Sequence, residues 1–408
     1  VNRNGVRIRN VKVQHFFYTG IELMTEGLAT VRDIEISDFV IKESARETTA
    51  ASFGNLQLRG DFENITIQRG TIEHLTRAIR ESSGYAIKAL RSWDDRERRA
   101  DFVRKSRILE VTTNGKAEAP WDNYRAPNFA IEFWNVGADE VEIARCRIAN
   151  QISLEFNDRR IRGAHSFWVH DNLIRTPTGA SIELANSNTI FERNYVDVSA
   201  NVNPWNVMGE YNSGSGNFNS RVNHNVFNLG NRSTSFFVFT EKLVNFRVYN
   251  NTFISAGGNV TLFEFRKPNS DGSDGIDVRN NLFALQSGQV QLIATIEGAS
   301  GQIPARFTFA NNAYSAGFGR VGVGTQYGNI RESGQFRAAG AIPFPYYSQS
   351  TQSVLTDRGE NVGLTFDGAG PDIGAGENSV ASPGIPVPTP TPVPTPVPTA
   401  TSTPTPVP

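Results

Sequence analysis

The stretch FRVYNNTFIS, at residues 246–255, sets two asparagines between two short runs of alternating apolar residues. One such copy would suggest a hairpin, because asparagine-rich turns commonly join two antiparallel strands. The chain repeats the pattern in the same frame, in IDVRNNLFAL (276–285), FTFANNAYSA (307–316), RVNHNVFNLG (221–230) and FWVHDNLIRT (167–176). A frame that is kept through so many copies indicates a repeat architecture rather than a row of hairpins.

Alignment of the copies puts one asparagine of each in a column, with Cys146 in the same place one repeat earlier. The column consists of Asn172, Asn194, Asn225, Asn251, Asn281 and Asn312. Apolar residues stand three positions before and two positions after each member, so strands are expected on both sides of a one-residue corner. In a coil that climbs one turn per repeat, parallel strands stack about 4.8 Å apart and like residues fall on like residues. We therefore expect the asparagines to bond to one another as a ladder, and their tolerance of the left-handed conformation suits the bend.

The repeat predicts an all-β fold, a single right-handed parallel β-helix of about eleven coils over residues 1–378. Earlier stretches without the asparagine, such as VRDIEISDFV (31–40) and ENITIQRGTI (63–72), continue the coil toward the N-terminus. Because the chain opens directly on a rung, further N-terminal coils or a cap are expected before it. Residues 379–408 form a Pro/Thr-rich tract, which predicts a disordered linker that leads to further modules.

The composition excludes several classes of function. The formal net charge of −1 does not give the basic surface on which nucleic-acid binding depends. No apolar run reaches the roughly 18–20 residues that span a bilayer. Cys146 is the only cysteine, so neither a disulfide framework nor a cysteine-based metal site is expected. A monomer without an organic cofactor is predicted.

Each repeat contains a third strand, which follows a loop of variable length; examples are YAIKAL (85–90), FAIEFW (129–134), ISLEF (152–156) and SIELA (181–185). Side-chain alternation turns the apolar residues of these strands inward and the charged ones outward from a single sheet. The predicted outward column contains Glu22, Lys88, Glu132, Glu155, Glu183 and Glu264, with Glu210 close to the same register. Ionised carboxylates one rung apart would repel each other by roughly 3–4 kcal/mol at an effective dielectric constant near 20. Two interpretations remain open, a solvated face and a site in which a cation, Lys88 or shared protons balance Glu132, Glu155 and Glu183.

The loops around this predicted sheet carry aromatic and basic residues. Exposed aromatic rings in polar loops are expected where sugar rings stack, and arginine forks bind carboxylates or sulfates. These features favour an acidic glycan as the ligand. The candidate substrate-binding residues are Trp93, Trp121, Tyr124, Arg125, Arg159, Arg160, His165, Trp205 and Glu210.

The NNxF rungs, together with GPDIGAGE at 370–377, which is expected to close the last rung, resemble the secreted right-handed parallel β-helix proteins of bacteria. That superfamily includes pectate lyases, chondroitinase- and alginate-lyase-like enzymes and polygalacturonase-like hydrolases. The resemblance covers about residues 1–380, and it specifies the fold more strongly than the function. It implies a secreted or cell-surface protein that acts on a polysaccharide, with its substrate groove on the sheet that follows the long loop.

The leading hypothesis from the sequence is a polysaccharide lyase that cleaves a uronate-containing polymer by β-elimination. Lys88 would be the base, Arg125 would clamp the substrate or protonate the leaving oxygen, and Glu132, Glu155 and Glu183 would hold Ca²⁺. One alternative is a glycoside hydrolase that uses two of the same glutamates. The other is a non-catalytic glycan-binding or cell-wall spacer module.

Overall fold

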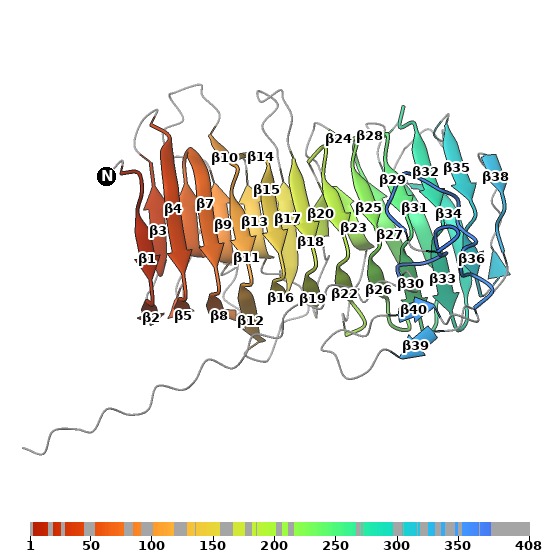
Figure 1. Cartoon of the computed structure of the whole chain (residues 1–408), viewed down its shortest axis with the longest axis horizontal. Coiled ribbons are helices and arrows are strands. Elements are labelled where there is room, and N and C mark those ends of the chain that lie inside the picture. The colour runs from red at the N-terminus through yellow and green to blue at the C-terminus, as the bar shows by residue number, and fades with distance from the viewer. Residues whose placement is uncertain are drawn as a thin grey trace, which may run out of the picture.

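The computed structural model describes residues 3–14, 19–25, 29–44, 54–76, 85–90, 101–117, 129–134, 136–155, 166–175, 182–184, 186–200, 206–210, 216–266, 270, 272–296, 304, 306–315, 317–318, 325–330, 336–338, 347–349, 353–366 and 368–376. These residues form the parallel β-helix that the sequence predicts (Figure 1). Short strands follow one another around the coil, and each pairs with the equivalent strand of the next coil. The predicted linker at 379–408 lies outside the described residues.

Three long sheets make up the coil. Sheet A has the path β1 (Arg7–Arg9), β4 (Val31–Ser37), β7 (Phe62–Gln68), β11 (Arg107–Leu109), β15 (Val141–Ala144), β18 (Phe167–His170), β21 (Ile190–Glu192), β25 (Arg221–Asn223), β29 (Arg247–Tyr249), β32 (Ile276–Arg279), β35 (Phe307–Ala310) and β38 (Thr325–Tyr327). Two further strands join it off this path, β10 (Phe102–Arg104) and β14 (Gly137–Asp139).

Sheet B follows sheet A after a short corner. Its strands are β2 (Lys12–Gln14), β5 (Val40–Ser44), β8 (Thr71–Thr76), β12 (Thr112–Ala117), β16 (Arg147–Ala149), β19 (Leu173–Arg175), β22 (Tyr195–Asp197), β26 (Val226–Asn228), β30 (Thr252–Ser255), β33 (Leu282–Leu285) and β36 (Ala313–Tyr314).

Sheet C is the third face of the coil and lies between sheet B and the next strand of sheet A. Its strands are β3 (Ile21–Met24), β6 (Gly54–Arg59), β9 (Tyr85–Leu90), β13 (Phe129–Trp134), β17 (Gln151–Glu155), β20 (Ile182–Leu184), β23 (Asn206–Glu210), β27 (Thr234–Phe239), β31 (Val260–Arg266), β34 (Gln289–Ile296) and β37 (Gly317–Phe318). The eleven strands each of sheets B and C confirm the predicted number of coils.

Two small pairs complete the strands of the described residues. Strands β24 (Asn217–Phe218) and β28 (Leu243–Val244) are parallel, whereas β39 (Phe336–Ala338) and β40 (Tyr347–Gln349) are antiparallel. Within the described residues, no helix is long and apolar enough to cross a membrane.

The asparagine ladder is confirmed. From Asn194 to Asn312, the side-chain oxygen of each member accepts from the backbone and side-chain nitrogens of the member one coil earlier; for example, Asn225 donates twice to Asn251 Oδ1, at 3.0 Å each. Asn251 in turn donates to Asn281 Oδ1 from its backbone at 2.9 Å and from its side chain at 3.0 Å. The backbone amide of Cys146 begins the ladder on Asn172, and Asn329, which the sequence alignment missed, continues it beyond Asn312.

The corner between sheets A and B differs from the prediction in one respect. It contains two residues, and the left-handed conformation belongs to the residue before the ladder asparagine, as in Asp171 (φ 55°) and Asn250 (φ 51°). The ladder asparagine itself turns inward, where its amide also bonds the backbone carbonyls of its own and the previous coil. The two demands on the corner, a left-handed backbone and a buried amide, are therefore met by two adjacent residues.

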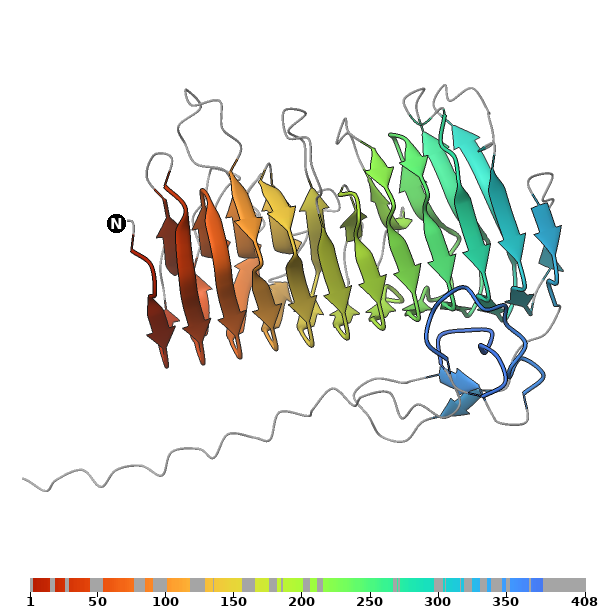
Figure 2. The same cartoon turned by 45° about the horizontal axis from the view of Figure 1, so that its top comes forward.

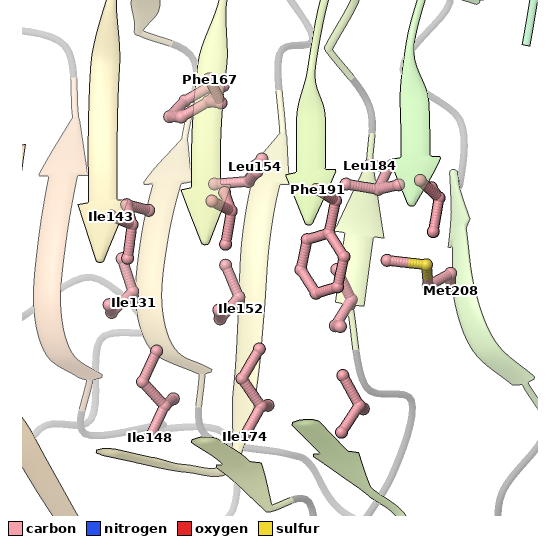
Figure 3. Close-up of a cluster of buried hydrophobic side chains, with 14 of the residues drawn as sticks. Ile131, Ile143, Ile148, Ile152, Leu154, Phe167, Ile174, Leu184, Phe191 and Met208 are labelled. Carbon is pink, nitrogen blue, oxygen red and sulfur yellow. The ribbon is translucent and has the colours of Figure 1, made fainter. Parts of the chain in front are cut away.

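Stacked apolar side chains fill the inside of the coil. Like residues stack along the coil axis, so that Ile131 and Ile152, and Ile148 and Ile174, lie side by side in Figure 3. Toward the C-terminus the stack becomes aromatic, with ring centroids 5.3 Å apart between Phe227 and Phe253. This continuous core holds the three sheets in fixed register and makes the outer faces rigid platforms.

The resemblance suggested that the segment GPDIGAGE closes the last coil. The structure shows that it does not. It packs on the outside of the last coils, where Asn250 Nδ2 donates to Asp372 O at 2.9 Å and Gly374 N donates to Asn280 O at 2.8 Å. Ile373 is buried there together with Leu282. The chain thus folds back over the corner of the coil, in the dark-blue segment of Figure 2.

Candidate active site on the outer face of sheet C

Sheet C is buried on both of its faces in strands β6 and β9. All six residues of β6 and all six of β9 are buried, whereas the neighbouring strand β7 of sheet A alternates between buried and partly exposed positions. An outward-facing side chain that is buried must be covered, and charged side chains are rarely buried without a partner. The outer face of sheet C is therefore built differently from those of the other two sheets.

The register of sheet C corrects the predicted column of charged residues. The outward column is Glu22, Gln57, Lys88, Glu132, Ser153, Glu183 and Gly209. Ser153, and not Glu155, stands between Glu132 and Glu183, while Glu155 pairs in register with Trp134 in the adjacent outward row. This alignment could not be predicted from the sequence, because the register shifts between Phe129 and Ile131 and the loops before these strands vary in length.

Carboxylates in this column never occupy adjacent rungs. Gln57 Nε2 donates to Glu22 at 2.7 Å, Lys88 Nζ lies 2.6 Å from Glu132 Oε2, and Ser153 Oγ donates to Glu183 at 2.5 Å. Each of these acids thus has a donor on an adjacent rung. The repulsion expected between successive glutamates does not arise, because a neutral or positive residue stands between them.

The centre of the column is a buried ion pair enclosed by two aromatic rings. The side chain of Lys88 exposes 1% of its surface and that of Glu132 5%. The Lys88 ammonium lies 3.7 Å from the centroid of the Tyr85 ring and 4.9 Å from that of Trp134, distances at which a cation and a ring attract each other. Trp134 itself remains 36% exposed, so it forms the solvent boundary of this cluster.

Burial sets the protonation of Glu132. Desolvation raises the pKa of this carboxyl above its ordinary value, and it outweighs the opposing effects of the Lys88 charge and of hydrogen bonds from Lys88 and Tyr85. Glu183, two rungs away, is only half-buried. The face thus combines a carboxyl that retains its proton to higher pH with a second carboxylate that water can reach.

Gly54 makes the room that Lys88 occupies. A Cβ at this position would stand 2.9 Å from both Leu56 O and Lys88 Cβ and 3.1 Å from Lys88 N. We expect Gly54→Ala to lower the melting temperature measured by circular dichroism, because backbone atoms would have to shift. Gly257→Ala is the matched control, since its nearest neighbour is the movable Ser287 hydroxyl at 3.3 Å. Equal melting temperatures for the two variants would contradict this account of the packing around Lys88.

The other predicted site residues divide into three groups. Glu264 is buried farther along sheet C, where Ser235 donates to it and Arg266 pairs with it at 2.5 Å. The strand positions of Glu155 and Glu210 are described, but their side chains are not. The remaining residues lie outside the described residues, namely Trp93, Trp121, Tyr124, Arg125, Arg159, Arg160, His165 and Trp205.

The described residues do not fit the expected calcium site. Within the part of the chain that the structure describes, no group of three or more histidine, cysteine, aspartate or glutamate side chains is placed to hold a metal ion. Glu132 is engaged by Lys88, and Ser153 separates it from Glu183. We derive no chemical step through calcium, and its binding stays a prediction.

Sequence reasoning missed the two aromatic residues at the centre. Tyr85 and Trp134 begin and end the very stretches, YAIKAL and FAIEFW, that supplied Lys88 and Glu132. Trp134 has the same outward parity as Glu132, so strict alternation alone would have placed it on this face. Comparison with known protein families gives no matching family model, and comparison with curated proteins gives no match. The site must therefore be interpreted from its own chemistry.

Proposed function

We propose that the outer face of sheet C binds a polysaccharide and hydrolyses it, with Glu132 as the general acid and Glu183 as the general base. The observation that carries the proposal is the difference between these two carboxyls on one column. Burial raises the pKa of Glu132, whereas Glu183 is half-buried and accepts a hydrogen bond from Ser153. Two carboxyls in unlike surroundings are the usual basis of acid and base roles in one site.

The spacing of the pair lies at the upper limit of the range for inversion of the anomeric centre. Two rungs separate Glu132 from Glu183, which corresponds to about 9.6 Å between strands. Inverting glycosidases hold their two carboxyls roughly 6.5–9.5 Å apart, because a water molecule must fit beside the sugar. In this reaction Glu132 gives its proton to the glycosidic oxygen as that bond breaks. Glu183 takes a proton from the attacking water, so that one water is consumed for each bond cleaved.

Trp134 supplies a binding surface for the sugar. The apolar face of a pyranose stacks on an exposed aromatic ring, and the polar atoms beside the ring bond its hydroxyls. Trp134 offers such a ring directly beside Lys88 and Glu132. Lys88 is a positioning residue in this proposal, because its short contact with Glu132 fixes the acid in place.

Elimination is the second candidate reaction, and one observation favours it. Lys88 and Tyr85, an amine and a phenol, meet at Glu132, and either could take a proton from a uronate ring. Burial acts against Lys88 as that base, because its side chain exposes 1% of its surface and its Nζ is already engaged by Glu132 at 2.6 Å. Hydrolysis therefore has the stronger support.

The products of the reaction distinguish the two candidates. The purified protein would be incubated with polyuronates, sulfated glycans and neutral glycans. We expect new reducing ends without ultraviolet-absorbing products, whereas unsaturated products would establish elimination. Glu132→Gln and Glu183→Gln should each lower kcat at least about 10²-fold, the usual contribution of one acid or base. Glu73→Gln, on the outer face of sheet B, is the control that should keep the wild-type rate.

The dependence on pH tests the role of Glu132. A general acid must be protonated, so kcat should fall as the pH rises through the raised pKa of this carboxyl. The basic limb should disappear in Glu132→Gln, while Trp134→Ala should raise KM with a smaller effect on kcat. Full rates in both carboxyl variants would overturn the proposal.

A further inference from the structure

A second row of outward residues, on sheet A, presents an exposed tryptophan between arginines. The register places these residues on successive rungs in the order Arg107, Glu142, Trp168, Ile190, Arg221 and Arg247. Trp168 exposes 42% of its surface, although tryptophan is generally among the more buried residue types. We call these six residues the sheet A row; their strands lie side by side in Figure 1.

The Trp168 ring is fixed on the side that faces the protein. It stacks on the ring of His170, with centroids 3.8 Å apart and planes inclined by 26°. Its indole N–H donates to Glu192 Oε1 at 2.9 Å. One face of the indole is thus held by contacts, and a large part of the ring is left open to solvent.

A network of charged residues supports His170. The imidazole is buried, with Nδ1 2.6 Å from Asp171 Oδ2 and Nε2 3.1 Å from Glu142 Oε1. Arg193 binds Asp171 through two hydrogen bonds, at 3.0 and 3.1 Å, and reaches Glu192 at 2.6 Å.

The same network keeps its carboxylates ionised. Burial alone would raise the pKa of Asp171 and of Glu192, but Arg193, with His170 at Asp171 and Asn223 at Glu192, holds the pKa of both below the usual range. The carboxylates of Asp171 and Glu192 are thus paired with Arg193 beneath the Trp168 ring. A platform that is rigid before binding loses little conformational entropy when a ligand stacks on it.

The charge of the row indicates the kind of ligand. Arg107 and Arg221 lie two rungs before and two rungs after Trp168, at about 9.6 Å on either side. The side chain of Arg107 is 62% exposed and that of Arg221 29%. Arg247, one rung further, is also exposed. Glu142 is the one acid among these six residues, and it is engaged by Arg107 and His170. Asp277, on the rung after Arg247, bonds Tyr249 and Arg279.

We infer that the sheet A row is a binding site for an acidic polysaccharide, in which a sugar ring stacks on Trp168 and carboxylate or sulfate groups bind Arg107 and Arg221. Repeating anionic groups along a stiff polymer suit cations that recur along the coil axis. The aromatic face contacts the apolar face of a sugar ring, and the arginines beside it bind the anionic groups of the polymer. The site lies on a different sheet from the Lys88–Glu132 cluster and does not depend on the activity proposed there.

The test measures the affinity of the whole chain for polygalacturonate and for chondroitin sulfate, with dextran as the neutral polymer, by affinity electrophoresis. We expect binding to both acidic polymers, no binding to dextran, and weaker binding as salt increases. Trp168→Ala should weaken binding at least tenfold, Trp168→Phe less, and Arg107→Gln severalfold. Val354→Ala, at an exposed apolar residue elsewhere, should leave the affinity unchanged.

Trp134→Ala distinguishes this site from the one on sheet C. Loss of binding in Trp168→Ala with an unchanged melting temperature supports the sheet A row, whatever Trp134→Ala does to cleavage. Wild-type affinity in both Trp168→Ala and Arg107→Gln would overturn the inference, and so would failure of the wild-type chain to bind either acidic polymer. Equal binding to double-stranded DNA, insensitive to Trp168→Ala, would show general polyanion attraction and would also overturn it.

Discussion

Asn251→Leu is expected to lower the free energy of unfolding by about 3–5 kcal/mol. The substitution removes an amide that accepts two hydrogen bonds from Asn225 and donates to Val222 O, Tyr249 O and Asn281 Oδ1. Each buried polar group that loses its partner costs roughly 1–3 kcal/mol, and leucine offers none in return. The effect should be large because the ladder couples three coils at this one residue.

Urea denaturation followed by circular dichroism measures this loss. The matched control is Asn228→Leu, in the strand that follows the corner, because its side chain is only partly buried and donates to Asp197 at 3.3 Å. The control should change the free energy of unfolding by less than about 1 kcal/mol. If Asn251→Leu were as stable as Asn228→Leu, the buried ladder would not contribute to stability in the way that its geometry implies.

Lys88→Met is expected to lower the stability at neutral pH by about 3–5 kcal/mol, because it leaves the buried Glu132 carboxylate without its counter-charge. The double variant Lys88→Met/Glu132→Gln should recover much of the loss, since no uncompensated charge remains. A double-mutant cycle from urea denaturation measures the coupling between the two residues. A coupling near zero would contradict the buried ion pair.

The loss in Lys88→Met should depend on pH with a definite sign. Burial already raises the pKa of Glu132 in the folded protein, and removal of Lys88 takes away the main force that opposes this. A carboxyl whose pKa is raised by folding contributes stability that is present below its unfolded pKa and is lost as the pH rises through the folded pKa. Lys88→Met should therefore approach the wild type in stability near pH 4 and fall behind it toward pH 8. The opposite trend would mean that Glu132 is not desolvated.

The fold could be predicted because its determinants are local and repeated. Each corner needs an asparagine at one fixed offset from inward apolar residues, so the ladder members align by eye from Asn172 to Asn312. Asn329 escaped this alignment because it follows Asn312 by 17 residues, a shorter step than any other in the column. The αL residue before each asparagine also escaped notice, because residues as unlike as Asp171, Arg193 and His224 occupy it.

The candidate site was only partly accessible to the same reasoning. Alternation within one strand correctly turned Lys88 and Glu132 outward, and the register makes them neighbours. Alternation cannot say which outward residue of one strand meets which of the next when loops of variable length intervene. A slip of two residues keeps every side chain on its face but changes its row, and this is how Ser153 came to stand where Glu155 was expected.

The sequence by itself therefore determined that the chain is a parallel β-helix, where its ladder lies and which face carries the charged strands, because each of these depends on offsets within a single repeat. Only the tertiary structure decided which side chains meet across repeats: the approach of Trp134 to Lys88, the hydrogen bond from Trp168 to Glu192, and the return of Ile373 onto Leu282. These contacts join residues that are many positions apart in the chain. They are fixed by the stacking of whole coils on a common core, which no local pattern encodes.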